Sequence, residues 1–165
     1  MATSRTGKDA CDLLDADHRA IKKMFKDYEV LAGSRARGAA LKKQVLARQI
    51  CSALTVHTQI EEELFYPALQ AAIKSGALVD EASVQHGVLR ELVAQIQQSE
   101  DEPLTDARVR VLGEYMDHHV KKERTELFAK ARAARKLDLV ALREQLDERK
   151  ETLMTEMADQ GELVD

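Results

Sequence analysis

Proline, glycine and tryptophan are scarce in this chain. Its 165 residues include 2 prolines and 7 glycines, and tryptophan is absent. Because few residues interrupt helices while alanine, leucine, glutamate, lysine and arginine are abundant, the composition favours long helices over strands. The length suits a single domain with one hydrophobic core.

Long apolar runs are also missing, and basic residues are not in excess. No segment approaches the roughly 20 apolar residues of a membrane span, and the opening MATSRTGKDA lacks the apolar stretch of a signal peptide. We therefore expect a cytoplasmic protein without membrane contacts. A formal charge of -4 and a pI of about 5.8 argue against nucleic-acid binding, since such proteins usually carry a basic face.

The two cysteines form no CxxC pair of the kind that binds metals through thiolates. Cytoplasmic cysteines normally stay reduced. We interpret Cys11 and Cys51 as buried small apolar residues, with a redox role as the alternative.

Apolar residues recur at spacings of three and four, as in amphipathic helices. We predict five helices, at residues 9–31, 39–74, 79–98, 105–134 and 138–157. Asp9 is expected to cap the first helix, and Pro67 to kink or divide the second. Long helices with short connections indicate an all-α fold, with an antiparallel up-down four-helix bundle in residues 1–136. The C-terminal helix and loose tail, residues 137–165, either pack on the bundle or provide a dimer face.

Four histidines lie on apolar faces of four different predicted helices. These are His18, His57, His86 and His119. On the fourth helix, His119 shares its face with Leu112 and Met116, whereas the adjacent His118 shares its face with charged residues and is assigned to the rim. Four neutral imidazoles in one apolar core need many polar partners, and a metal bound to their nitrogen lone pairs removes that cost.

Two glutamates extend this pattern. Glu61 follows His57 by four residues, and Glu123 follows His119 by four, so each HxxxE pair lies on one side of its helix. Each half of the chain therefore supplies a histidine followed by an HxxxE pair, and EEELF (61–65) echoes RTELF (124–128). This repeat predicts two metals related by a pseudo-twofold axis, each bound by two histidines of one half, with both glutamates bridging.

Imidazole and carboxylate ligands without thiolate fit iron or manganese better than zinc. We expect two iron ions joined by an oxo or hydroxo bridge, with open coordination positions at which chemistry takes place. The neighbouring acids Glu62, Glu63 and Glu126 are expected to be solvated or to support the ligands from outside.

Four segments together resemble the hemerythrin-like family, also called HHE cation-binding domains. They are DADH (15–18), HTQIEEELFYPAL (57–69), QH (85–86) and HHVKKERTELF (118–128). The resemblance spans residues 9–134 and implies a four-helix bundle around a non-haem di-iron centre, with ligands at the six positions already chosen. The family includes oxygen carriers, sensors of oxygen and iron, and proteins that consume peroxide or nitric oxide.

The chain departs from the oxygen carriers at Arg90, where those proteins have a further histidine. This departure argues against reversible oxygen carriage, and the HxxxR pattern is similar to a bacterial subgroup with catalase-like members. We expect the head of Arg90 to approach the metals, either paired with Glu61, Glu123 or another acid, or as a cation that stabilises bound peroxide. Tyr115 is expected to pack in the core or to reach an iron-bound oxygen.

Two functions fit these features. The first is a catalase-like di-iron enzyme that consumes hydrogen peroxide or a related small oxidant, which Arg90 slightly favours. The second is a protein that binds or senses oxygen, nitric oxide or iron without turnover. A helical interaction module with incidental histidines fits less well. We expect a monomer or homodimer whose partner is a small molecule: peroxide, O2 or NO.

Overall fold

The structure is a computed structural model that describes residues 8–74, 76–99 and 103–161, and these residues form helices joined by turns. The long helices are α1 (Ala10–Ala32), α2 (Ala39–Ile60), α4 (Gly76–Gln98), α5 (Pro103–Lys122) and α7 (Leu139–Asp159). Two π-helical turns, η1 (Glu61–Phe65) and η2 (Glu123–Leu127), follow α2 and α5. Beyond these turns the same two rods continue as α3 (Tyr66–Ala72) and α6 (Phe128–Ala133).

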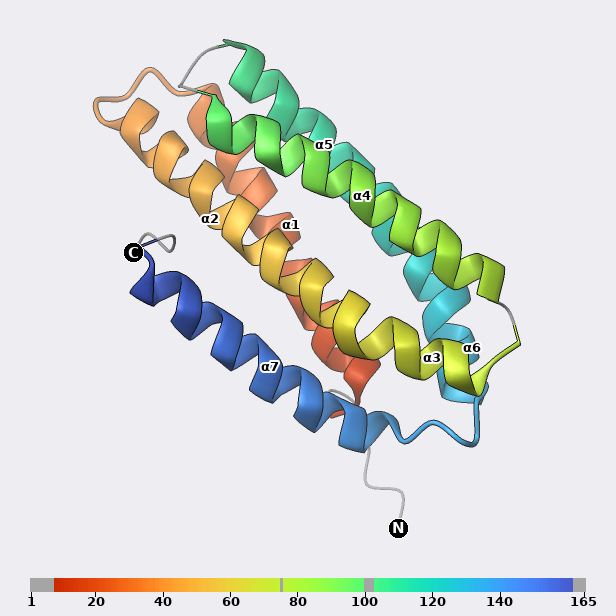
Figure 1. The fold of residues 1–165 in the computed structure, drawn as a ribbon. Coiled ribbons are helices and arrows are strands. Elements are labelled where there is room, and N and C mark those ends of the chain that lie inside the picture. The colour runs from red at the N-terminus through yellow and green to blue at the C-terminus, as the bar shows by residue number, and fades with distance from the viewer. Residues whose placement is uncertain (1–7, 75, 100–102, 162–165) are drawn as a thin grey trace.

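The four helices α1, α2, α4 and α5 form a bundle (Figure 1). Helix α1 packs on α2 and α4 packs on α5, while contacts of α1 with α5 and of α2 with α4 close the ring. Helix α7 lies outside the bundle and packs on α1, α2 and η1. The predicted all-α bundle with an additional C-terminal helix is confirmed, whereas a domain boundary after residue 136 stays a prediction.

Helix ends follow local capping chemistry. The side chain of Asp9 accepts a hydrogen bond from the N–H of Asp12 at 2.8 Å, and the side chain of Asp12 accepts one from the N–H of Asp9 at 3.1 Å. This reciprocal capping box begins α1 where the sequence predicts. Asp138 caps α7 in a similar way by accepting the N–H of Ala141 at 3.0 Å.

Both long predicted helices that carry HxxxE are interrupted by a π turn. The second is divided directly before Pro67, as expected from a residue that has no N–H to donate. The fourth is divided at η2, between α5 and α6, although no proline lies there. Proline therefore cannot be the common cause of the two π turns. The feature that they share is the glutamate at which each turn begins.

Two apolar clusters fill the molecule. One lies toward α3, α6 and α7 and includes Leu14, Phe65 and Leu146. The other includes Ile21 and Leu112 on the far side of the four interior histidines. A polar layer thus separates two hydrocarbon regions, and those regions hold its helices at a fixed spacing.

Helix α7 is attached to the bundle by its predicted leucine stripe. Leu142, Leu146 and Leu153 are buried, and Leu139 and Met157 pack against the first cluster while partly exposed. Burying each leucine stabilises the docked helix by about 2 kcal/mol. Residues 162–165 of the predicted loose tail lie outside the described residues.

Two further expectations concern the cysteines and the membrane. Cys11 and Cys51 are buried and free, and burial raises the pKa of both thiols to about 12. They behave as small apolar residues, as predicted. Among the described helices, none combines the length and the apolar character needed to cross a bilayer.

Candidate metal centre

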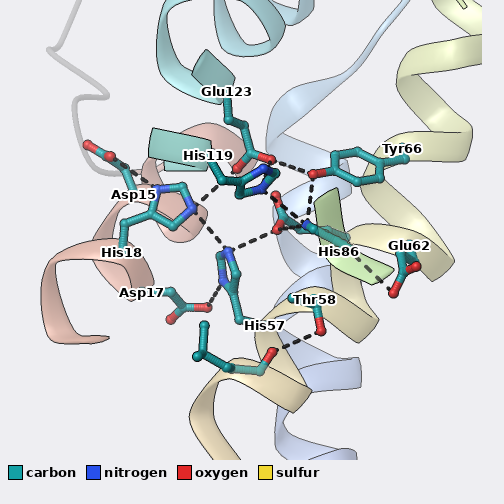
Figure 2. Close-up of polar contacts among 12 residues, drawn as sticks. Asp15, Asp17, His18, His57, Thr58, Glu62, Tyr66, His86, His119 and Glu123 are labelled. Atoms are coloured by element: carbon teal, nitrogen blue, oxygen red, sulfur yellow. Dashed lines mark hydrogen bonds and ion pairs between the residues drawn. The ribbon is translucent and has the colours of Figure 1, made fainter. Parts of the chain in front are cut away.

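The interior histidines and the two glutamates of the HxxxE pairs meet in the middle of the bundle (Figure 2). All of them are buried, with at most 5% of any residue exposed. The six are His18 of α1, His57 of α2, His86 of α4, His119 of α5, and Glu61 and Glu123, which begin η1 and η2.

These residues form two overlapping groups. The first consists of His18, His57, Glu61 and Glu123, and its four candidate ligand atoms lie within 4.8 Å of one another. The second consists of His86 and His119 with the same two glutamates, within the same distance. The structure therefore brings together two histidines from each half of the chain around a shared pair of carboxylates.

Within each group the histidine Nε2 atoms face one another. The Nε2 atoms of His18 and His57 are 3.0 Å apart. Those of His86 and His119 are 3.2 Å apart. Two nitrogens that each lie about 2.1 Å from one cation, at a right angle, are about 3.0 Å apart. Each pair is therefore spaced to bind one metal ion.

The outward-facing Nδ1 atoms of two of these rings have oxygen partners. Nδ1 of His57 lies 3.1 Å from Oδ2 of Asp17. Nδ1 of His119 lies 2.6 Å from Oε1 of Gln85. A carboxylate or amide oxygen accepts a hydrogen bond, so in each neutral ring Nδ1 carries the proton and Nε2 keeps its lone pair for a cation.

The other two rings have weaker outer contacts. Nδ1 of His18 lies 3.6 Å from Oδ1 of Asp15. Nδ1 of His86 lies 3.8 Å from Oε2 of Glu62. These separations exceed a normal hydrogen bond, although each acid places negative charge behind its ring.

The shared carboxylates lack ordinary partners. Both oxygens of Glu61 and Oε1 of Glu123 are buried without a hydrogen bond. Oε1 of Glu61 lies 2.9 Å from Nε2 of His57, which in the neutral ring presents a lone pair. Lone pairs that face one another in a buried space repel. A cation bound between them removes this repulsion, because both atoms become its ligands. The donor set therefore fits metal cations.

The same buried carboxylates shift the pKa values of their neighbours in the metal-free protein. Burial works against protonation of His57, yet Glu61 and Asp17 raise its pKa to about 10. Burial also works against ionisation of Glu123, yet hydrogen bonding to His119 helps to hold its pKa well below the usual range. The carboxylates thus create a field that favours positive charge in this space.

Sequence analysis did not single out Tyr66, although its side chain lies at the centre. Its hydroxyl donates to Oε2 of Glu123 at 2.5 Å and lies 3.1 Å from Nε2 of His86 (Figure 2). Burial, together with Glu123 and Glu61, raises the pKa of Tyr66 well above its ordinary value. The hydroxyl therefore keeps its proton beside the candidate ligands.

The π turns explain why helical periodicity missed Tyr66. Its N–H donates to the carbonyl of Glu61, five residues earlier, and the N–H of Phe128 donates to that of Glu123 in the same way. In a π turn, a residue five positions on completes about one turn, whereas in an α-helix it is rotated well away. Each π turn therefore directs the fifth residue after its glutamate toward the centre.

The repeat contains the signal that could have found this tyrosine. Aligning EEELF with RTELF is wrong by one residue, because the π turns are in register when His57 is aligned with His119. Tyr66 and Phe128 then occupy equivalent positions, each nine residues after its histidine. The Phe128 ring is nearly parallel to His18, with centroids 6.0 Å apart and 8° between planes.

Of the two expectations for Arg90, the structure shows the ion pair with an acid. Its side chain is 54% exposed and donates to Glu62 at the rim of the centre. The acid is Glu62, which is partly exposed, and not Glu61 or Glu123, which are buried. Any influence of Arg90 on the metals therefore acts through Glu62, which faces His86.

Tyr115 also differs from the more specific expectation. It is partly buried and packs against the second apolar cluster. It lies a full turn before His119, and helical side chains lean toward the N-terminus, so its ring points away from the polar layer. Of the two alternatives, the structure shows core packing, and the tyrosine at the centre is Tyr66. His118 is exposed, as predicted.

A cavity of about 810 Å³ lies between α1 and the continuous run of α5, η2 and α6, and His18 is among its lining residues. His18 is the most exposed of the six candidate ligands, at 5%. The charged lining residues are Arg19, Lys22, Lys121, Arg124, Arg132, Asp12, Asp15 and Asp117. Basic residues outnumber acids here, in a chain whose overall charge is negative.

Comparisons with known proteins agree with this geometry. Residues 9–131 match the family model of the hemerythrin HHE cation binding domain. Among solved structures, the chain is similar to a hemerythrin HHE cation binding domain-containing protein from Mycobacterium kansasii, with a TM-score of 0.73 and 21% identity over 92% of this chain and 91% of that one. At this identity the likeness shows the fold alone. No curated protein matches the chain.

Proposed function

Because the chain belongs to the hemerythrin HHE cation-binding domain family, we propose that its buried centre binds two iron ions and consumes hydrogen peroxide in a catalase-like reaction. The observation that carries this proposal is the pair of overlapping ligand groups with the protonated hydroxyl of Tyr66 beside them. A related small oxidant is the nearest variant of the substrate.

The ligand set supports iron. Each group offers two imidazoles and two shared carboxylates, and no cysteine belongs to either group. Such a mixture suits iron or manganese, and four protein residues per metal leave room for a small molecule. A pair of irons would supply the two-electron redox chemistry that interconverts peroxide, dioxygen and water.

The position of Arg90 supports turnover over oxygen carriage. The oxygen carriers have a further histidine at this position, whereas Arg90 is bound to Glu62 at the rim. Each half of the centre is therefore left with two histidines. We infer that the centre has more open coordination than a carrier and is suited to reaction with peroxide.

Tyr66 can manage protons in such a reaction. Two molecules of hydrogen peroxide give one dioxygen and two waters, so one peroxide loses two protons while the other gains two. The Oη atom of Tyr66 holds a proton within hydrogen-bond distance of Glu123 and His86. A positioned group of this kind typically accelerates proton transfer by about 100-fold or more.

The cavity beside His18 provides access for a small substrate. Its lining carries both basic and acidic side chains and is therefore suited to a small polar molecule such as hydrogen peroxide. Phe128 and His18 both line this cavity, and their rings lie nearly parallel with centroids 6.0 Å apart. The apolar clusters on both sides exclude bulk water from the ligands.

The test combines iron analysis with an oxygen electrode. We expect about two irons per chain and oxygen evolution on addition of hydrogen peroxide. Tyr66→Phe should keep the iron and lose about 100-fold in rate. His118→Ala, which removes an exposed histidine of the same bundle, is the matched control and should retain the full rate. Iron binding without oxygen evolution would contradict peroxide turnover and support a protein that binds or senses oxygen, nitric oxide or iron.

A further inference from the structure

Helix α7 reaches the metal centre through one ion pair. Nζ of Lys150 lies 2.5 Å from Oδ1 of Asp17, and Oδ2 of the same carboxylate lies 3.1 Å from Nδ1 of His57. We propose that Lys150 is a positioning residue for the metal half-site of His18 and His57, acting through Asp17. The inference rests on the proposed metal pair.

The two oxygens of Asp17 have separate tasks in this chain of contacts. Lys150 binds one oxygen and so fixes the carboxylate in the rotation that presents the other oxygen to His57 (Figure 2 shows the Asp17–His57 contact). The side chain of Asp17 is 11% exposed, so most of this carboxylate is in contact with protein. An outer carboxylate fixed in this way orients a ligating imidazole and makes its other nitrogen a better donor.

The docking of α7 does not depend on Lys150. Three buried leucines attach the helix to the bundle. The adjacent Arg149 also pairs with Glu63, at 2.8 Å. Arg149 thus makes a comparable ion pair from α7. Because Glu63 belongs to neither ligand group, this ion pair does not involve the centre. The chain thus supplies its own matched control.

The other half of the centre lacks this device. Gln85 occupies the position equivalent to Asp17, since each directly precedes the first histidine of its half. Gln85 contacts Nδ1 of His119 with a neutral amide oxygen. The influence of Lys150 is therefore confined to one of the two metal positions.

The experiment titrates metal-free protein with Co2+, following its visible absorption bands and the heat of binding. We expect two binding steps in the wild type. Lys150→Met should weaken one step about tenfold and shift the bands of that step, as is typical of lost outer contacts. Lys150→Arg should restore both, and Arg149→Met should change neither. Circular dichroism checks that each variant keeps its helices.

A second variant tests the route through Asp17. Asp17→Asn should reproduce the loss seen in Lys150→Met, and the double variant should add little to either single change. Equal affinities in Lys150→Met and wild type, or an equal loss in Arg149→Met, would overturn the role of Lys150. Absence of Co2+ binding to the wild type would overturn both this inference and the proposed metal centre. Normal metal binding without peroxide turnover would overturn the proposed reaction alone.

Discussion

The two halves of the bundle supply the same ligands in different surroundings. In the α1–α2 half, the charged Asp17 lies behind His57, and the apolar ring of Phe128 lies nearly parallel to that of His18. In the α4–α5 half, the neutral Gln85 lies behind His119, and the hydroxyl of Tyr66 approaches Nε2 of His86. One half thus has a carboxylate and an apolar ring beside its histidines, and the other has an amide and a hydroxyl.

This difference indicates that the two halves have different roles although they supply the same ligands. A carboxylate behind an imidazole strengthens its donation to a metal and stabilises higher metal charge. A phenol beside the opposite pair provides a proton where a substrate oxygen needs one. We therefore expect proton transfers on the side of His86 and His119. The predictions below test this comparison, beginning with the largest effect.

Removing a shared ligand should affect both halves at once. Glu61→Ala should lose both irons, because its carboxylate belongs to both ligand groups. His57→Ala and His119→Ala should each keep about one iron per chain, since each ring belongs to one group. Iron analysis after desalting measures this. If His57→Ala lost both irons, the halves would not be separable units.

Exchanging the two residues that follow the π turns should show which half handles protons. Tyr66→Phe should lower oxygen evolution about 100-fold while both irons remain. Adding Phe128→Tyr, which places a hydroxyl on the opposite half, should not restore the rate. Restoration by this second change would show that either half can use the proton donor and would end the proposed division.

Exchanging the outer partners should shift metal affinity in opposite directions. Asp17→Asn should weaken binding at the first group about tenfold, whereas Gln85→Glu should strengthen binding at the second by a similar factor. Competition with a chelator of known affinity measures both. If both substitutions changed metal affinity in the same direction, the charge of the residue behind the histidine would not distinguish the two halves.

Arg90→Leu should have the smallest effect. One expectation from the sequence is a cation that stabilises bound peroxide, but Arg90 forms an exposed ion pair at the rim, and such a pair contributes little, about 1 kcal/mol at most. We expect a rate within about fivefold of the wild type, measured with the oxygen electrode. A loss comparable to that of Tyr66→Phe would show that Glu62 transmits the charge of Arg90 to His86.

The success of sequence reasoning followed the regularity of the helices. His57 lies in α2 and Glu61 directly follows the end of that helix, so spacings of three and four still placed both correctly inside. Tyr66 lies just beyond a π turn, where that geometry fails, and periodicity undervalued it. Arg90 has a long side chain, so which acid it pairs with depends on the tertiary structure and could not be predicted from helix spacing. Lys150 reaches Asp17 from 133 residues away, a contact that no local pattern encodes.

The most direct test of the central claim is an anomalous difference map, recorded at the iron edge from crystals of the iron-loaded protein. We predict two peaks inside the bundle, one beside His18 and His57 and one beside His86 and His119, with Glu61 and Glu123 contacting both. A single peak, peaks at the surface, or a cluster of histidines and glutamates without iron would contradict the account.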